Sequence, residues 1–192
     1  MKTQAIIISF VAILLSNCAQ KSVYDKETST LDSLKIVLQV KRNELNKFDK
    51  AIESISAYKL KTYGAFLKSN LKDTINKNQA NTLQIFLNAV EALTEFEKMR
   101  APLASQTEIS ITQLQTLSAD LKANLIQSDQ ATRFITNEKH NADRQISILE
   151  QTIKTLNISI INIRNYLPKT EDLIKQINGG KLPSVVSDSL AD

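Results

Sequence analysis

Apolar residues recur along most of this chain at alternating spacings of three and four, which is the seam pattern of packed amphipathic helices. The first run consists of Leu31, Leu34, Leu38, Lys41, Leu45, Phe48, Ile52 and Ile55, and seven of its eight positions are apolar. The pattern then shifts phase and continues through Leu60, Tyr63, Leu67, Leu71 and Ile75, followed by Leu83, Leu87, Val90 and Leu93. These runs predict helices over most of the first half of the chain.

The second half carries the longest uninterrupted run. Stepping by three and four from Ile111 reaches Leu167 through seventeen positions in one phase, thirteen of which are apolar. We therefore expect one helix from about residue 106 to residue 167, about 90 Å long at the rise of an α-helix. Its seam is weakest between Ser128 and Lys139, where polar residues occupy most seam positions.

The clearest predicted turn lies at 101–105, next to Pro102. The residue before a proline is disfavoured in helical geometry. Ser105 followed by Glu108 also matches a capping box, in which the two side chains satisfy backbone N–H groups at a helix start. A helix is therefore expected to end near Pro102 and a new one to begin directly after it.

Weaker signals predict the remaining boundaries. The polar stretch 76–81 indicates a kink, with Asn81 as the cap of a restarted helix. Pro168 predicts the end of the second long helix. Thr170 could then cap a short helix over 171–177, which Asn178 and Gly179 would terminate.

Together these patterns predict an all-α fold over 28–178, an elongated antiparallel helical hairpin or coiled coil. The two arms on either side of Pro102 match in length, and a content of only three Gly and three Pro suits long helices. The alternative is a four-helix bundle, folded again near Gly64 and near 136–141. Residues 179–192 would form a flexible tail.

The N-terminus has the pattern of an export signal over 1–17, with Lys2 followed by an apolar stretch from Ala5 to Leu15. That stretch is shorter than the roughly 20 residues that cross a bilayer, but it suits a secretory signal. The sequence Leu15-Ser16-Asn17-Cys18 resembles the bacterial lipobox, in which a peptidase cuts before the cysteine and the new N-terminus is acylated. The resemblance covers residues 1–18 only.

The lipobox resemblance implies a lipidated Cys18, a membrane anchor, and 18–27 as a tether between the lipid and the helices. Ala19, which follows the cysteine, implies the outer membrane of the bacterial cell envelope, facing either the periplasm or the cell surface. Cys18 is the only cysteine, so no disulfide can form within the chain. We expect stability to come from packing.

Other candidate chemistry is sparse. His140, the only histidine, has Glu138 and Asp143 nearby, which is too few ligands for a metal site. Glu91 and Glu95 share a helix face, but the Glu-x-x-His pattern of a di-iron bundle is missing. There is also no Gly-rich phosphate loop and no Gly-x-Ser-x-Gly elbow. These observations predict a protein that is not an enzyme and needs no cofactor or metal.

The expected function is that of a membrane-anchored lipoprotein with a structural or protein-interaction role. Its helical seams would pair with a partner protein or a second copy. The charges, with a net value of +4, are interspersed rather than clustered, so no nucleic-acid partner is expected. The alternative is a helical-bundle binding module for a small apolar or lipid ligand. The chain has four tyrosines, which could either anchor a partner or lie at the edges of the core: Tyr24, Tyr58, Tyr63 and Tyr166.

Overall fold

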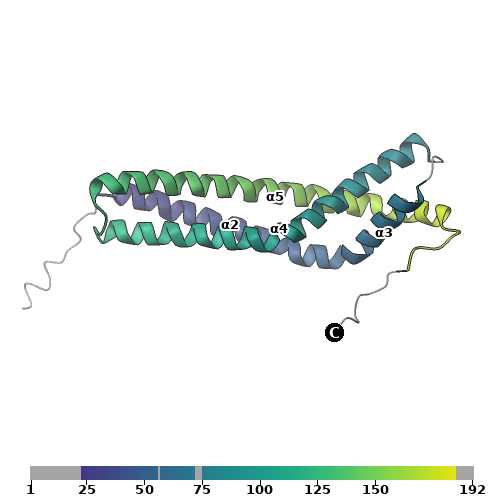
Figure 1. The fold of residues 1–192 in the computed structure, drawn as a ribbon, viewed down its shortest axis with the longest axis horizontal. Coiled ribbons are helices and arrows are strands. Elements are labelled where there is room, and N and C mark those ends of the chain that lie inside the picture. Colours follow the sequence, from purple (N-terminus) through teal and green to yellow (C-terminus); the bar gives the residue numbers. More distant parts are fainter. Residues whose placement is uncertain (1–22, 56, 72–74, 185–192) are drawn as a thin grey trace, which may run out of the picture.

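The computed structural model describes residues 23–55, 57–71 and 75–184. In this part of the chain there are four α-helices and no strand: α2 (Asp25–Ile55), α3 (Ala57–Asn70), α4 (Lys77–Lys122) and α5 (Ser128–Ile177). α2 and α3 run in one direction, α4 returns alongside them, and α5 reverses again along the same axis (Figure 1). The predicted all-α, elongated antiparallel fold is confirmed, and it is built from three passes of the chain.

The three passes close the predicted seams against one another. Leu31, Leu38 and Leu45 of α2 are buried, while Leu34 and Phe48 of the same seam pack partly buried against the same core. α5 is 50 residues long, which corresponds to about 75 Å at 1.5 Å per residue. The molecule is therefore a rod with one continuous core along its length.

The predicted turn at 101–105 is wrong, because α4 runs through Pro102 without a break. Ser105 and Glu108 lie in the helix interior and are exposed, so they form no capping box at a helix start. A proline inside a helix costs about 3 kcal/mol, because it removes one backbone hydrogen bond and crowds the preceding turn. Pro102 and Lys98 face solvent, so water can reach the carbonyl left without a donor. α4 changes direction in this region, as Figure 1 shows.

The chain reverses instead at 123–127, inside the stretch predicted as one helix from 106 to 167. Asn124 adopts a left-handed conformation with φ of 54°. The Leu125 N–H donates to the Asp120 carbonyl at 3.0 Å and the Asn124 N–H to the Leu121 carbonyl at 3.2 Å. This pair of bonds is a Schellman motif, which ends a helix with a left-handed residue. The motif separates α4 from α5.

α5 continues through Pro168, so the predicted helix end at that residue and the separate helix over 171–177 are wrong. Pro168 faces solvent, as Pro102 does. Thr170 is fully buried and caps nothing. The predicted stop at Asn178 and Gly179 is confirmed, since α5 ends at Ile177 and Gly179 has φ of +61°.

The start of α4 is capped five residues earlier than predicted. The Asn76 side chain accepts from the Gln79 N–H at 3.0 Å, and the Gln79 side chain accepts from the Asn76 N–H at 3.0 Å. This reciprocal pair is a capping box. Asn81 is therefore not the cap, and it lies exposed in the second turn of the helix.

Two halves of the rod differ in their cores. We call the part formed by 25–47, 100–122 and 128–150 the α2 half, and the part formed by 48–71, 75–99 and 151–184 the α3 half. In the α2 half, all buried apolar side chains are aliphatic. This half also contains most of the buried polar residues of the described chain, namely Thr28, Thr107, Ser110, Ser118 and Gln145. The fully buried aromatic side chains of the described chain, Tyr63, Phe86 and Phe96, all lie in the α3 half.

Candidate functional site

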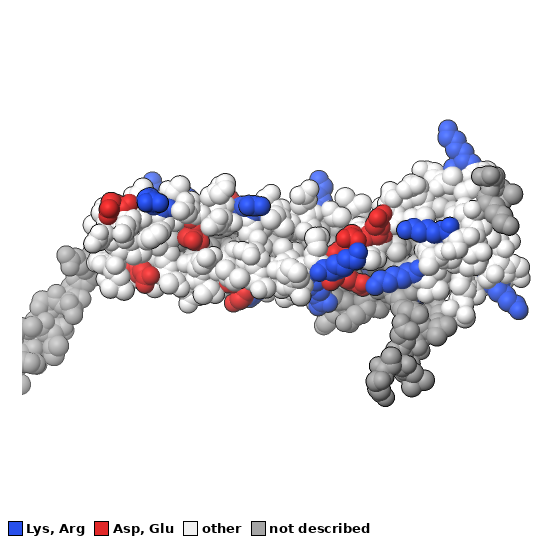
Figure 2. All heavy atoms as spheres, in the orientation of Figure 1, with Lys and Arg blue, Asp and Glu red and all other residues white. Residues whose placement is uncertain are grey.

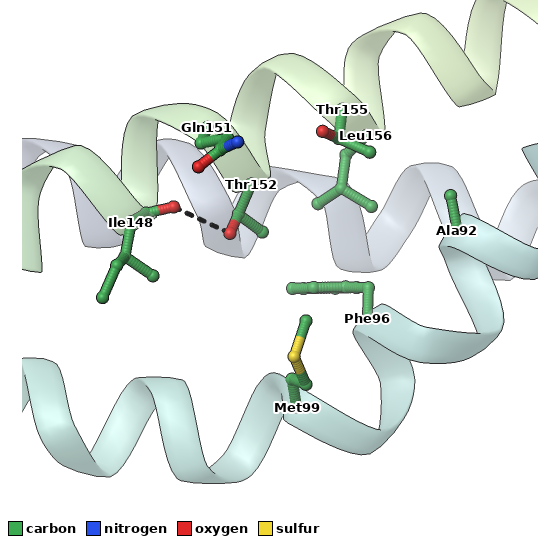
Figure 3. A pocket seen from close by; sticks show the side chains of 8 residues that line it. All are labelled: Ala92, Phe96, Met99, Ile148, Gln151, Thr152, Thr155 and Leu156. Carbon is green, nitrogen blue, oxygen red and sulfur yellow. Dashed lines mark hydrogen bonds between the residues drawn. The ribbon is translucent and has the colours of Figure 1, made fainter.

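A groove lies between α4 and α5 at the bend of α4. It has a volume of about 270 Å³ and is lined by Ala92, Phe96 and Met99 of α4 and by Ile148, Gln151, Thr152, Thr155 and Leu156 of α5. Figure 3 shows Phe96 and Met99 reaching from α4 toward the α5 side chains across the groove. Pro102 lies three residues after Met99, on the C-terminal side of this groove along α4.

The groove has an apolar floor, and its rim combines apolar side chains with the exposed polar residues Gln151 and Thr155. Phe96 is 2% exposed and Leu156 is 1% exposed, so both belong to the core. Met99 is 50% exposed and Ile148 is 40% exposed, and they form the accessible edges. The Thr152 hydroxyl donates to the Ile148 carbonyl at 2.8 Å (Figure 3), so its proton is already committed within α5. The groove can therefore receive an apolar side chain, but it does not present a group for acid–base or nucleophilic chemistry.

A second groove of about 440 Å³ extends the first toward the α2 half and shares Ile148 with it. It includes Ile109, which is 47% exposed, beside polar residues such as Gln113 and Arg144. Met99, Ile148 and Ile109 thus form a row along the α4–α5 face. Sequence periodicity did not identify this row, because all three residues lie beside the seam positions rather than on them.

The predicted carboxylate pair lies elsewhere, on the groove between α3 and α4. Glu91 and Glu95 are exposed and line that groove with Lys61 and Lys68. Glu95 accepts from Lys98 at 2.7 Å, which raises the pKa of the Lys98 ammonium. Glu95 is therefore part of a surface ion pair, which contributes little to stability, and Glu91 lines the same groove.

Figure 2 shows both signs of charge intermixed on the face in view, with a denser mixed group near the middle of the rod. Ion pairs join the passes in both halves. Arg42 of α2 pairs with Glu108 of α4, and Lys61 of α3 lies 2.6 Å from Glu97 of α4. These pairs align neighbouring helices, while the right-hand end of the rod in Figure 2 carries only scattered Lys and Arg side chains.

His140 is exposed, as is Asp143, whereas Glu138 is half-buried and its pKa is raised by that burial. Among the described residues, no group of three or more His, Cys, Asp and Glu side chains could hold a metal ion. His140 and its two acidic neighbours are therefore not brought together with further ligands.

One cluster in the α3 half links α3 to α5. The Tyr63 hydroxyl donates to Glu171 at 3.2 Å, and Lys59 lies 2.7 Å from the same carboxylate. The hydrogen bond to Glu171 raises the pKa of Lys59, and burial raises the pKa of the Tyr63 phenol. Tyr63, Lys59 and Glu171 are all partnered within this cluster, so its role is best explained as structural, holding α3 against α5.

The tyrosines whose side chains the structure describes divide between the core and its edge. Tyr63 is 1% exposed, so it is a core residue and not the edge residue considered from the sequence. Tyr24 and Tyr166 pack partly buried against the core, and the Lys169 ammonium lies 5.4 Å from the centre of the Tyr166 ring. The Tyr58 side chain lies outside the described part of the structure.

Cys18 and the predicted signal 1–17 also lie outside the described residues, as do residues 185–192 at the C-terminus. No described helix combines the length and the apolar character needed to cross a bilayer.

No protein-family model, no characterised protein and no solved structure matches this chain.

Proposed function

We propose that this protein is a membrane-anchored bacterial lipoprotein of the cell envelope, with a non-catalytic structural or protein-interaction role carried by its helical rod. The lipid would be attached at Cys18 and held in the outer membrane. The lipobox-like sequence supports the anchor, and the rod supports the structural role. The apolar grooves and satisfied polar clusters agree with a body that contacts other molecules without transforming them.

The single observation that carries the proposal is where the rod begins relative to Cys18. α2 starts at Asp25, seven residues after the cysteine. A chain of seven residues spans at most about 25 Å when fully extended, whereas α5 alone is about 75 Å long. A lipid at Cys18 would hold one end of the rod close to the bilayer and leave the greater part of its length away from it.

The three-pass fold also changes where a partner would bind. The seams predicted to pair with another chain are closed within this one, since Leu38, Leu114 and Leu149 are all buried. Partner contacts would therefore use the outer flanks, such as the row of Met99, Ile148 and Ile109. Self-association remains a prediction, which sedimentation over a range of protein concentrations would test.

The anchor is tested by Cys18→Ala in the full chain expressed in a Gram-negative host. We expect metabolic fatty-acid labelling to disappear and the protein to leave the membrane fraction. Ser16→Ala, which keeps the cysteine, serves as the matched control and should retain labelling. Membrane retention of unlabelled Cys18→Ala protein would refute the lipid anchor.

The rod is tested separately by small-angle scattering of the Cys18→Ala protein. A maximum dimension near the length of α5, about 75 Å, is expected at low concentration. A compact, nearly spherical profile would contradict the structural role while leaving the lipid anchor unaffected.

A further inference from the structure

The two most exposed large apolar side chains of the described chain lie at the same end of the rod. Val23 is 86% exposed and Leu125 is 73% exposed, and the next in order, Ile36, is 56% exposed. Val23 lies directly before α2, and Leu125 lies in the turn between α4 and α5. Figure 1 places the start of α2 and this turn together at one end.

The exposure of Leu125 is not required by the turn that contains it. In a Schellman motif, the residue after the left-handed position usually packs its apolar side chain back on the last helical turns. Here the residues at the positions that would make this contact are Ala119, which is exposed, and Asp120, which is polar. Neither offers a buried apolar surface, so Leu125 is left in solvent.

The opposite end of the rod provides an internal comparison. α5 closes with the same type of motif, in which the Gly180 N–H donates to the Lys175 carbonyl at 2.7 Å. The residue equivalent to Leu125 is there Gly180, which has no side chain. An apolar group at this position is thus a property of one end only.

That end is the one nearest the proposed anchor. Val23 is the fifth residue after Cys18, and a chain of five residues spans at most about 18 Å when fully extended. Acyl chains on Cys18 would therefore keep Val23 and the neighbouring turn within this distance of the headgroup layer. An exposed leucine held so close to a bilayer can bury its side chain at the interface.

Charge at this end indicates which lipids are needed. Within the first and last turns that form it, acidic residues outnumber basic ones, with Asp25, Glu27, Asp120 and Asp129 against Lys26 and Lys122. Lys122 is also paired with Asp32 at 2.8 Å. Such an end has no excess of positive charge for anionic headgroups, so the contact is apolar in nature.

We propose that the α4–α5 turn is a second membrane-contact site, in which Leu125, assisted by Val23, inserts into the headgroup region of the bilayer and holds the rod end-on. This inference rests on the proposed lipid anchor at Cys18. The site takes a lipid surface as its ligand and does not require anionic lipid.

The test uses the acylated full chain in vesicles of zwitterionic phosphatidylcholine. Acylation consumes the only native thiol, so Leu125→Cys introduces a single site for a fluorophore. Matched labels are placed at Ile177→Cys, at the far end, and at Ile36→Cys, on the side of α2. Both are exposed apolar positions in the native chain.

We expect quenchers attached to shallow positions of the lipid to reduce the fluorescence at position 125 several-fold more than at 177 or 36. Equal quenching at 125 and 177 would overturn the proposal. Strong quenching at 36 together with 125 would also overturn it, because the rod would then lie flat on the bilayer.

Intact mass separates this inference from the proposed function. Acylated protein with no lipid quenching at position 125 refutes the second contact and leaves the anchor standing. Protein without acyl chains refutes both. Leu125→Asp provides an independent check. This variant should keep fatty-acid labelling and the unfolding midpoint unchanged but lose the end-on orientation. The loss would be seen with labels at Ala123→Cys and Ile177→Cys, which should then be quenched equally.

Discussion

The α2 half and the α3 half of the rod reach the same helical architecture with different cores. The α2 half is slender and aliphatic, and polar side chains buried in it join one helix to another. An example is the buried Ser118 of α4, which donates to the half-buried Asp32 of α2 at 3.2 Å; Lys122 of α4 donates to the same carboxylate at 2.8 Å. The α3 half instead packs aromatic rings beside a bent helix and is clasped by Glu171. The difference indicates that regular heptads build one half and individual side-chain shapes build the other.

The consequence is a division of stability and alignment between the halves. Large rings remove more apolar surface from water than leucines do, so the α3 half gains most from burial. Buried polar pairs contribute little net energy but are costly to break, so they favour one alignment of the helices. The following experiments test whether the two halves differ in this way.

The largest effect is expected from truncating an aromatic ring in the α3 half. Phe86 is 0% exposed, so Phe86→Ala should lower the free energy of unfolding by about 3–5 kcal/mol. Denaturant unfolding followed by helical circular dichroism measures this. The matched control is Phe134→Ala, at a position 46% exposed, which should cost less than about 1 kcal/mol. Similar losses in the two variants would contradict the assignment of Phe86 to the core.

A smaller effect is expected from the buried polar pair of the α2 half. The Gln145 amide donates to the Thr107 hydroxyl at 2.9 Å, and that hydroxyl donates to the Leu103 carbonyl at 2.7 Å. Thr107→Val leaves the amide without its acceptor and should cost about 1–3 kcal/mol. Adding Gln145→Leu should recover most of the loss, as a double-mutant cycle would show.

The control for this pair is Thr152→Val, because the Thr152 hydroxyl bonds only within its own helix. It should change the unfolding free energy by less than about 0.5 kcal/mol. A double variant no more stable than Thr107→Val alone would show that the pair does not act as a unit.

A gain of stability is expected where α3 approaches α4. Gly64 lies in α3, and a Cβ atom there would meet Leu87 Cδ2 at 3.7 Å and Val90 Cγ1 at 4.0 Å, which are ordinary contacts. Gly64→Ala should therefore raise the unfolding free energy by up to about 1 kcal/mol through helix propensity. Gly179→Ala, at φ of +61°, should lower it by about 1 kcal/mol. Thermal unfolding would reveal the opposite signs, and a loss in both variants would mean that α3 and α4 are packed too tightly for a methyl group.

The smallest effect concerns pH. The hydrogen bond from Lys122 holds the pKa of Asp32 below its ordinary value, against the opposing effect of burial. Because the folded-state pKa is lowered, the stabilisation is present above the unfolded pKa of about 3.9 and is lost as pH falls through the folded value. Asp32→Asn should thus cost at most about 1 kcal/mol at neutral pH, since the pair is partly exposed.

That cost should shrink as pH falls below the unfolded pKa of about 3.9 and through the lower folded value, because the native carboxylate then becomes protonated. Unfolding of both proteins across this pH range measures the difference. If the cost of Asp32→Asn does not change with pH, the cost does not arise from the charge of Asp32.

Much of the fold could be predicted from periodicity. The seam residues Leu31, Leu38 and Leu45 are buried as expected, and so are Leu149, Leu156 and Ile163 in the last helix. Burial depends on spacing along one helix, which a single sequence displays directly. The number of passes depends instead on where the chain turns, and there the strongest local signals were misleading.

The prolines and Asn124 explain that failure. Pro102 and Pro168 are tolerated because they face solvent and because buried neighbours on both sides hold their helices in place. The true reversal is marked only by Asn124 after Lys122, a weaker signal for a helix end than glycine or proline. The seam also keeps its phase across this turn, from Leu121 of α4 to Ile135 of α5, so periodicity alone shows no break.

The groove at the bend of α4 was not predictable from the sequence. Met99 and Ile148 lie beside the seams of two helices, and their meeting depends on how far α4 bends. A single sequence gives neither that angle nor the rotation of one helix against the next. Glu91, Glu95 and His140, the candidate residues chosen by their chemistry, are exposed on the surface.

The odd number of passes has a consequence for what the rod presents. A two-arm hairpin or a four-pass bundle would return the chain to the side from which it started. Three passes instead place residues 178–184 at the opposite end from Val23 (Figure 1). With its N-terminal side tied to a membrane, the protein would act as a spacer that displays its C-terminal segment about 75 Å away, a distance set by the length of α5. A domain or epitope tag fused after that segment would be carried to the same distance from the bilayer.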